Sequence, residues 1–147
     1  MFIGVECQSD DRRGMLNLNY PIGINGITDW EDIENIWTEV FYVKMGVKPE
    51  NNKFYMTEPP LTKKENREKM AEIMFEKLNV PEMYVGVSAV CALFAFGKTT
   101  GIVLKSGHTV THTVPIYEGF ALPHAILKMD MGGRDLTAHL KAKIIEN

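Results

Sequence analysis

The stretch that decides the fold reads Gly-Ile-Val-Leu-Lys-Ser-Gly-His-Thr-Val-Thr-His-Thr-Val-Pro-Ile-Tyr-Glu-Gly-Phe-Ala-Leu, at residues 101–122. Two apolar runs, 102–104 and 110–116, flank a short polar tip at 105–109, a pattern typical of a β-hairpin. The tip holds a lysine, a serine, a glycine and a histidine, and its backbone amides together with the lysine would suit an anion. The alternative is an ordinary solvated turn, because short motifs are weak evidence.

The composition is that of an ordinary globular domain. The 147 residues are 45% hydrophobic and 24% charged, and their net charge of −3 argues against a nucleic-acid partner. Cys7 and Cys91 lie far apart without metal-ligand spacing, which predicts free thiols in a reducing compartment, the cytoplasm. No apolar run has the length of a membrane span or the position of a secretion signal, so we expect neither a membrane nor export.

Predicted strands and helices alternate along the chain, which places it in the mixed α/β class. Residues 1–14 show no hydrophobic period and are expected to be mobile or to depend on a neighbour for order. Beside the hairpin, the patterns predict strands at 15–20, 53–57 and 82–87, and helices from Thr28, over 63–78, over 88–96 and from 132 to about 145.

Two of the helices have start signals and apolar stripes. Thr28 with Glu31, and Thr62 with Glu65, have the spacing of capping boxes. Trp30 and Trp37 share one helix face, which indicates either core packing or an aromatic docking surface. A buried stripe is predicted on the second helix at Met70, Ile73, Met74 and Leu78. The helix over 88–96 is apolar all round and is predicted to be buried.

The residues alone support neither a metal site nor nucleophilic catalysis. His108 and His112 are four apart in a hairpin, where that spacing does not bring two side chains together, and no cysteine or carboxylate completes a ligand set. Ser88 and Ser106 lack the local signature of an activated nucleophile. Cys91 lies in a predicted buried helix, where thiols are usually inert.

Several long segments, in the same order and at the same separations, resemble the actin family. They are Asn-Arg-Glu-Lys-Met at 66–70, Thr-Thr-Gly-Ile-Val at 99–103, Thr-His-Thr-Val-Pro-Ile-Tyr-Glu-Gly at 111–119, Ala-Leu-Pro-His-Ala-Ile-Leu at 121–127 and Gly-Arg-Asp-Leu-Thr at 133–137. Weaker matches include Tyr20-Pro21-Ile22 and Thr57-Glu58-Pro59-Pro60-Leu61. The resemblance runs from about Gly4 to the end of the chain.

The resemblance implies a fold and a domain assignment. Actins consist of two ribonuclease-H-like halves that close on Mg-ATP, and the matched region is rather less than half of such a chain. Residues 1–147 are therefore expected to form one truncated actin-like region with a partial α/β ATPase fold. Residues 15–98 would supply later elements of the first half, and residues 99–147 the opening hairpin and helix of the second.

The tip of the hairpin departs from the family pattern. Actins read Asp-Ser-Gly-Asp-Gly there, whereas this chain has Lys105-Ser106-Gly107-His108-Thr109. The two lost carboxylates organise Mg²⁺, which prefers oxygen ligands and is repelled by a lysine. Ser88 takes the place of the glutamine that orients the attacking water, while His112 matches the histidine that assists it. His112 would then be a vestigial catalytic residue, and hydrolysis is expected to be absent.

The resemblance also implies binding residues. Contacts with nucleotide phosphates, ribose or adenine would come from Ser106, Gly107, Thr109, Gly133 and Arg134. A cleft for the helices of partner proteins would be lined by Tyr84, Phe94, Gly97, Thr99, Tyr117 and Phe120, unless these side chains belong to the core. We expect no protein metal site, and ATP with Mg²⁺ to bind weakly or not at all.

Three interpretations follow. The first is an actin-like protein fragment of the cytoplasmic cytoskeleton, with a degenerate nucleotide site and no enzymatic activity. The second is a non-catalytic interaction module that binds actin or actin-binding proteins through actin-like surfaces. The third is a truncated product without a settled function, because a partial sheet exposes strand edges and apolar faces.

Overall fold

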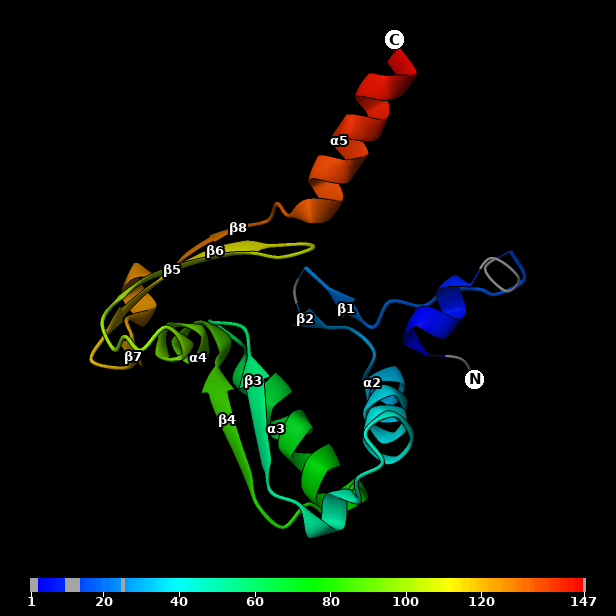
Figure 1. The fold of residues 1–147 in the computed structure, drawn as a ribbon, viewed down its shortest axis with the longest axis vertical. Helices are drawn as coiled ribbons and strands as arrows, with labels where there is room; N and C mark the ends of the chain where they lie inside the picture. Colours follow the sequence, from blue (N-terminus) through cyan, green and yellow to red (C-terminus); the bar gives the residue numbers. More distant parts are fainter. Residues whose placement is uncertain (1–2, 10–13, 25, 147) are drawn as a thin grey trace. The chain divides into compact units, whose positions relative to one another are not determined.

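A computed structural model describes residues 3–9, 14–24 and 26–146 (Figure 1). Helices and strands alternate along the chain, which confirms the predicted mixed α/β class. The segment expected to be mobile, residues 1–14, lies partly outside the described residues. The part that is described includes a short 3-10 helix, η1 (Gly4–Gln8).

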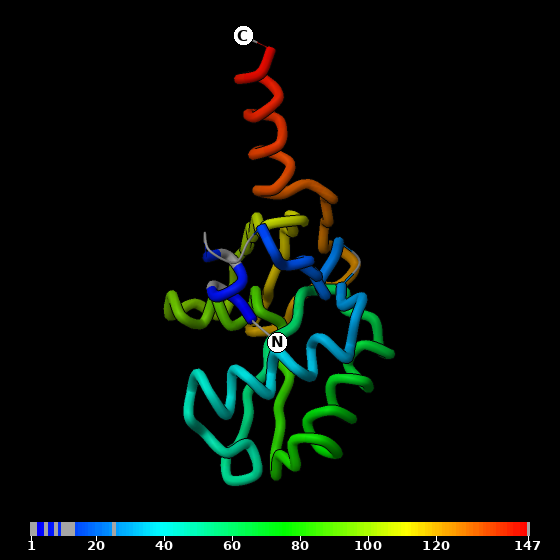
Figure 2. Tube along the Cα trace, turned by 90° about the vertical axis from the view of Figure 1, so that its right-hand side faces the viewer, coloured from blue at the N-terminus to red at the C-terminus, as the bar shows by residue number. Residues whose placement is uncertain are grey.

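The chain forms two compact units, each built from two separate stretches of sequence. Residues 1–53 and 68–82 make up the first unit, and residues 54–67 and 83–147 make up the second. Figure 2 traces the chain through both units from its blue N-terminal end to its red C-terminal end. The boundary at residues 67 and 68 falls inside a helix, so this helix contributes residues to both units.

The first unit is mainly helical. Its elements are η1, the strands β1 (Ile22–Gly23) and β2 (Gly26–Ile27), α2 (Trp30–Thr38), the π-helical turn η2 (Glu39–Lys44), the 3-10 turn η3 (Pro49–Asn51), the end of α3 (Lys64–Glu72) and the π-helical turn η4 (Ile73–Lys77). The strand predicted at 15–20 is wrong. No described strand pairs with it, although Leu16 and Leu18 are half-buried and alternate with exposed residues as the pattern predicted.

The first long helix, α2, begins at a different cap from the one predicted. Asp29, and not Thr28, is the N-cap, and its carboxylate accepts a hydrogen bond of 3.1 Å from the Asp32 amide. Trp30 and Trp37 do share a face, as predicted: their rings meet edge to face with centroids 6.5 Å apart. Both rings are half-buried, so this pair belongs to the packing of the unit.

The second long helix lacks its predicted capping box but keeps its predicted stripe. The Thr62 hydroxyl donates to the Pro59 carbonyl at 2.7 Å, and α3 begins only at Lys64. Because the Thr62 hydroxyl is hydrogen-bonded within the preceding turn, the prediction that Thr62 caps this helix is wrong. The stripe is confirmed, since the following residues are all buried: Met70, Ile73, Met74 and Leu78. Ile33 of α2, Phe41 of η2, Pro49 and Val80 are also buried in the first unit.

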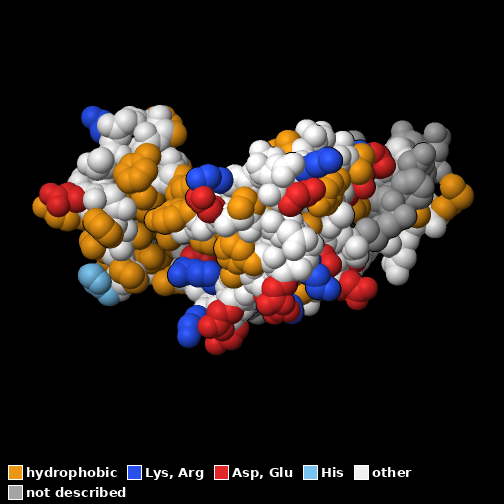
Figure 3. All heavy atoms as spheres, turned by 90° about the horizontal axis from the view of Figure 1, so that it is seen from below, with side chains coloured by type: hydrophobic (Ala, Val, Ile, Leu, Met, Phe, Trp, Pro, Cys, Tyr) orange, Lys and Arg blue, Asp and Glu red, His pale blue; other side chains and the backbone are white. Residues whose placement is uncertain are grey.

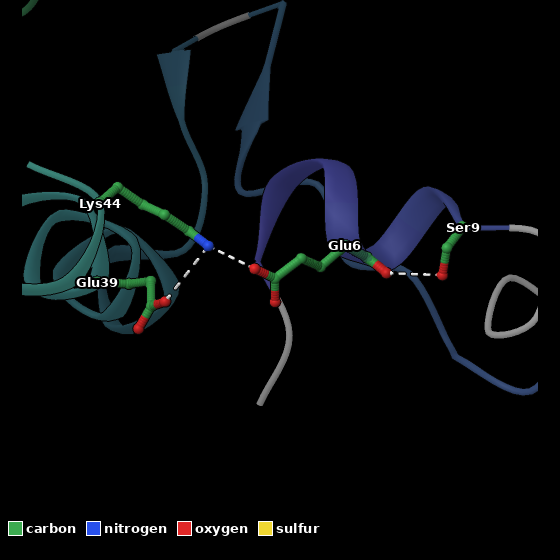
Figure 4. A network of polar contacts seen from close by, with 4 residues as sticks. All are labelled: Glu6, Ser9, Glu39 and Lys44. Atoms are coloured by element: carbon green, nitrogen blue, oxygen red, sulfur yellow. Dashed lines mark hydrogen bonds and ion pairs between the residues drawn. The ribbon is translucent and has the colours of Figure 1, made fainter.

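An ion pair joins the N-terminal 3-10 helix to η2 within the first unit. The Lys44 ammonium contacts the carboxylates of Glu6 and Glu39, the latter at 4.0 Å (Figure 4). The hydrogen bond to Glu6 is the main reason that the pKa of Lys44 lies above its ordinary value. Ser9 closes the end of η1 by donating to the Glu6 carbonyl at 3.2 Å.

The second unit contains two separate sheets. Its elements are β3 (Phe54–Glu58), the start of α3, β4 (Met83–Val87), α4 (Ser88–Ala95), β5 (Gly101–Ser106), β6 (Thr111–Tyr117), β7 (Phe120–Ala121), the 3-10 turn η5 (Pro123–Ala125), β8 (Leu127–Met129) and α5 (Gly133–Glu146). Strands β3 and β4 are parallel, in register from Phe54 opposite Met83. Strand β6 pairs antiparallel with β5, β7 and β8, which confirms the predicted hairpin and adds two strands that the sequence did not predict.

A small core joins α4 to the four-stranded sheet. Ala89 and Leu93 of α4 are buried against Val114 and Ile116 of β6. The prediction that α4 is buried on all sides is wrong, because Phe94 is 50% exposed and Phe96, just beyond the helix, is 84% exposed. The Cys91 thiol is half-buried and lies 3.4 Å from the Tyr55 hydroxyl.

The opposite face of the sheet is largely apolar and open. Ile102 and Leu104 of β5 and Leu127 of β8 are each about 70% exposed. No residue of α5 is buried, and the helix extends away from the sheet in both Figure 1 and Figure 2. The space-filling view in Figure 3 shows hydrophobic side chains, in orange, on the surface of the molecule. Among the described residues, no helix combines the length and hydropathy needed to span a membrane.

A buried carboxylate closes the end of β3. Glu58 is only 3% exposed, and the Arg67 guanidinium binds both of its oxygens, Nε at 3.2 Å and a terminal nitrogen at a shorter distance. A buried charge that loses its partner keeps its desolvation penalty without compensation. The pair therefore ties the C-terminal end of β3 to the first turns of α3.

Replacing Arg67 by alanine is expected to lower the free energy of unfolding by about 3 kcal/mol, because it leaves the Glu58 carboxylate buried and unpaired. Urea unfolding followed by circular dichroism measures this change. The matched control is Lys69→Ala, which breaks an exposed ion pair with Glu72 and should cost less than about 0.5 kcal/mol. Equal effects of the two substitutions would contradict the structural role of the buried pair.

Candidate functional site

The candidate site lies at one end of the β5–β6 hairpin, where the buried face of the sheet meets the start of α4. Side chains alternate along β6, so that His112, Val114 and Ile116 point to the same buried face. Val114 and Ile116 face the helix, and His112, 6% exposed, continues their row. The hydrophobic core thus fixes the direction in which the histidine points.

Two lysines flank this histidine on adjacent strands. Lys105 of β5 and Lys128 of β8 are each directly opposite His112 in the strand register. Opposite residues in an antiparallel ladder share a face of the sheet. The Lys105 ammonium also donates to the Ser88 hydroxyl at 3.1 Å. We call these four residues, Ser88, Lys105, His112 and Lys128, the Lys105 cluster.

The surroundings of His112 favour its neutral form. Burial is the main cause of a lowered pKa, and the positive charges of Lys128 and Lys105 lower the pKa further. Asp130, which pairs with Lys128 at 2.8 Å, acts in the opposite direction. At neutral pH, the cluster therefore holds two cations, one neighbouring carboxylate and a neutral imidazole.

The polar tip of the hairpin makes different contacts from those expected. The Gly107 amide donates to the Val110 carbonyl at 2.9 Å and closes the turn. The carbonyls of Gly107 and His108 accept hydrogen bonds of 2.9 Å from the amides of Gly133 and Arg134. Donors at the start of α5 are thereby used within the protein. Neither Gly107 nor Thr109 has a positive φ, so the turn needs no left-handed residue at these positions.

The residues predicted to bind nucleotide are therefore partly brought together. Gly107, Gly133 and Arg134 meet through the backbone hydrogen bonds that join the tip to α5. The Ser106 and Thr111 hydroxyls lie 3.0 Å apart, and Thr111 also donates to the Met131 carbonyl at 2.8 Å. These bonds hold the hairpin against the segment before α5. The nucleotide contacts of these residues stay a prediction.

Most of the predicted cleft residues surround the end of α4. The Gly119 amide donates to the Thr99 carbonyl at 2.7 Å, and a side chain at Gly119 would come within 3.0 Å of the Phe94 ring. Gly97 ends the helix with a φ of +69°, as predicted. Tyr117 and Phe120, the residues that flank the β6–β7 turn, are 58% and 77% exposed.

Tyr84 occupies a different place, on β4, where its ring stacks on Tyr55 of β3 at a centroid distance of 5.2 Å. Like Phe94, Tyr117 and Phe120, it is at least half exposed. The alternative that these four aromatic residues form part of the core is therefore wrong. They line the surface of the second unit.

Lys128 and Asp130 belong to the site although the sequence did not point to them. Lys128 lies on β8 and Asp130 follows directly after it, and the sequence patterns predicted no strand in this stretch. The signal available was the alternation of Leu127, Lys128 and Met129, which is short but typical of a strand. If β8 and its pairing with β6 had been predicted, Lys128 would have been placed opposite His112.

A protein-family model described as Actin matches residues 1–147. The chain belongs to the actin family. The resemblance described from the sequence predicts that Lys105 takes the place of a metal-organising aspartate and Ser88 that of a glutamine. The structure shows that Lys105 and Ser88 contact each other, through the bond from the Lys105 ammonium to the Ser88 hydroxyl. The two residues that are predicted to depart from the actin pattern are thus next to each other in space.

The Lys105 cluster does not fit Mg²⁺. The ion needs several oxygen ligands, of which carboxylates are the usual ones in proteins. In the described part of the chain, no group of three or more His, Cys, Asp or Glu side chains is placed to hold a metal. The Lys105 ammonium faces His112 instead and would repel a divalent cation.

The contact between the hairpin tip and α5 depends on Gly132. A side chain there would lie 2.6 Å from the carbonyl oxygens of Gly107 and His108, which are backbone atoms that cannot move aside easily. At the neighbouring Gly133, the nearest atom would be the Gly107 oxygen at 3.7 Å, an ordinary contact. The two glycines therefore form a matched pair for mutation.

Gly132→Ala is expected to break the bonds from the Gly133 and Arg134 amides to the tip, whereas Gly133→Ala should preserve the Arg134 bond. Hydrogen exchange measures the effect: the Arg134 amide should exchange at least about tenfold faster in the first variant, a loss of about 1.4 kcal/mol of protection. Equal exchange of this amide in the two variants would show that α5 does not need the close approach at Gly132.

Proposed function

We propose that this chain is a non-hydrolysing member of the actin family that serves the cytoskeleton through its surfaces. The observation that carries the proposal is the Lys105–Ser88 contact of 3.1 Å beside His112. It replaces two groups on which hydrolysis would depend, a metal-organising carboxylate and a water-orienting amide. Of the catalytic residues that the resemblance to actins implies, the cluster then keeps only the histidine, His112.

The chemistry of phosphoryl transfer explains why these replacements matter. The reaction depends on positioning the nucleophile and on stabilising charge around the transferred phosphoryl group. The Ser88 side chain is short and accepts a hydrogen bond from Lys105, so it is poorly suited to hold a water in line. The lowered pKa of His112 favours its neutral form, and no group of three or more His, Cys, Asp or Glu side chains among the described residues is placed to hold a metal beside it.

We further propose that Mg-ATP binds weakly or not at all. The proposal is supported by the misfit between the Lys105 cluster and Mg²⁺. It is also supported by the hairpin tip, whose carbonyls and the first amides of α5 bond to each other. Any contribution of Gly133 and Arg134 to a ribose or adenine contact would come from atoms outside these bonds.

A second candidate function is binding of an amphipathic helix from actin or an actin-binding protein. The exposed rings of Phe94, Tyr117 and Phe120 favour it, because large exposed aromatic residues are uncommon on a surface without a partner. Thr99 and Gly119 fix the backbone beneath them through their 2.7 Å hydrogen bond. This function and the absence of hydrolysis are compatible with each other.

With Mg-ATP in excess, the chain is expected to release inorganic phosphate no faster than a control without protein. The physical reason is the loss of both the metal-organising carboxylates and the water-orienting side chain. A continuous phosphate-release assay makes this measurement, and Lys105→Ala serves as the matched variant. Release above the control rate in the unmodified chain, at a rate that changes in the variant, would overturn the proposal.

A further inference from the structure

Helix α4 covers one face of the four-stranded sheet, and the other face carries exposed apolar side chains. Val103 of β5 packs against the core beneath α4, so its neighbours on the strand lie on the opposite face. The register of β6 with β5 and β8 brings side chains of β8 to that same face. The large apolar residues there are 49–71% exposed, and we call them the open sheet face: Ile102, Leu104, Leu127 and Met129.

Helix α5 has an apolar stripe that is also exposed. Leu136, Leu140 and Ile144 follow one another at intervals of four residues, which places them on one side of the helix. These three side chains are 59–68% exposed, and no residue of α5 is buried. Because most helical stability in proteins comes from the packing of an apolar face, a helix of 14 residues that buries none is marginal by itself. The stripe therefore needs a surface to pack on.

The contacts at the start of α5 direct the helix away from its own sheet. The Gly133 and Arg134 amides bond to the carbonyls of the hairpin tip at 2.9 Å, and Gly132 fits there only without a side chain. Figure 1 and Figure 2 both show α5 extending away from the strands. The open sheet face and the stripe of α5 therefore both stay exposed within one chain.

We propose that two copies of this chain associate by exchanging α5, so that the stripe of each copy lies on the open sheet face of the other. This inference goes beyond the proposed function and does not depend on it. Each copy supplies the same two surfaces, so the arrangement closes on a two-fold axis. The product is a dimer, in which both surfaces are used and no further copy can add at either of them.

The dimensions of the two surfaces match. The stripe from Leu136 to Ile144 is about 12 Å long at the rise of an α-helix. Across the sheet, from β5 over β6 to β8, two strand spacings cover about 10 Å. The exchange would bury all seven apolar residues of the two surfaces in each copy, on the order of 1,000 Å² in total, which is the area that a specific interface needs. Pairing the two stripes helix on helix would bury only three per copy.

The first experiment is sedimentation velocity of the full chain between about 1 and 100 µM, the range suited to an interface of this size. We expect a concentration-dependent shift from monomer to dimer. Ile144→Gln should weaken dimerisation at least about tenfold, because it places a polar group in the apolar contact. Leu104→Gln should act in the same way from the sheet side.

The matched control is Ile145→Gln, which changes the same residue type at the next position of α5. Ile145 is 73% exposed and lies on a different side of the helix from the stripe, so this substitution should leave dimerisation unchanged. Both isoleucines are exposed in the single chain, so neither substitution removes a contact that the fold needs.

Disulfide trapping tests which surfaces meet. Leu104→Cys is mixed with an affinity-tagged Leu140→Cys chain and oxidised, and mass spectrometry of the linked peptides separates the new links from any through Cys7 or Cys91. The exchange predicts a link between position 104 of one copy and position 140 of the other. The inference is overturned if the chain stays monomeric, if it forms assemblies larger than a dimer, if Ile144→Gln and Ile145→Gln weaken dimerisation equally, or if position 140 links only to itself.

Discussion

The packing of β6 against α4 is the constraint on which the second unit depends. Val114 and Ile116 are almost completely buried against Ala89 and Leu93. Because side chains alternate on a strand, burying these two residues leaves only one direction for His112. The same packing brings the start of α4, with Ser88, to the strand end that carries Lys105. An apolar core of four residues therefore determines the geometry of a polar cluster.

This arrangement separates the fold of an actin-family protein from its usual chemistry. The core, the hairpin and the turn at Gly119 depend on apolar packing and backbone hydrogen bonds, and not on the charge of Lys105. In the proposed function, by contrast, the chemistry depends on the charge of this single side chain at the end of the ladder. The exposed apolar face around Ile102, Leu104 and Leu127 remains a property of the sheet whichever charge is present, and favours contact with another surface.

Much of the fold could be predicted from the sequence, since the hairpin, the strands near 53–57 and 82–87 and the stripe from Met70 to Leu78 follow from composition and hydrophobic pattern; the parallel pairing of the two strands was not predicted. The errors concern the starts of the two helices, which depend on individual side-chain hydrogen bonds. Asp29 caps α2 in place of the predicted Thr28, and the Thr62 hydroxyl bonds to the turn that precedes α3. At the site, sequence identified Ser88, Lys105 and His112 separately. Their contact, and the presence of Lys128, depend on strand register, which distant pairing sets and a single sequence does not encode locally.

The most direct test of the central claim is the pKa of His112, measured by NMR titration of its ring in the unmodified chain and in Lys105→Ala. The account predicts a pKa below the ordinary value of 6.5 in the unmodified chain, because burial, Lys128 and Lys105 all disfavour the charged ring. It predicts a higher pKa in Lys105→Ala and no change in Lys98→Ala. The same pKa in both variants would contradict the placement of Lys105 against His112.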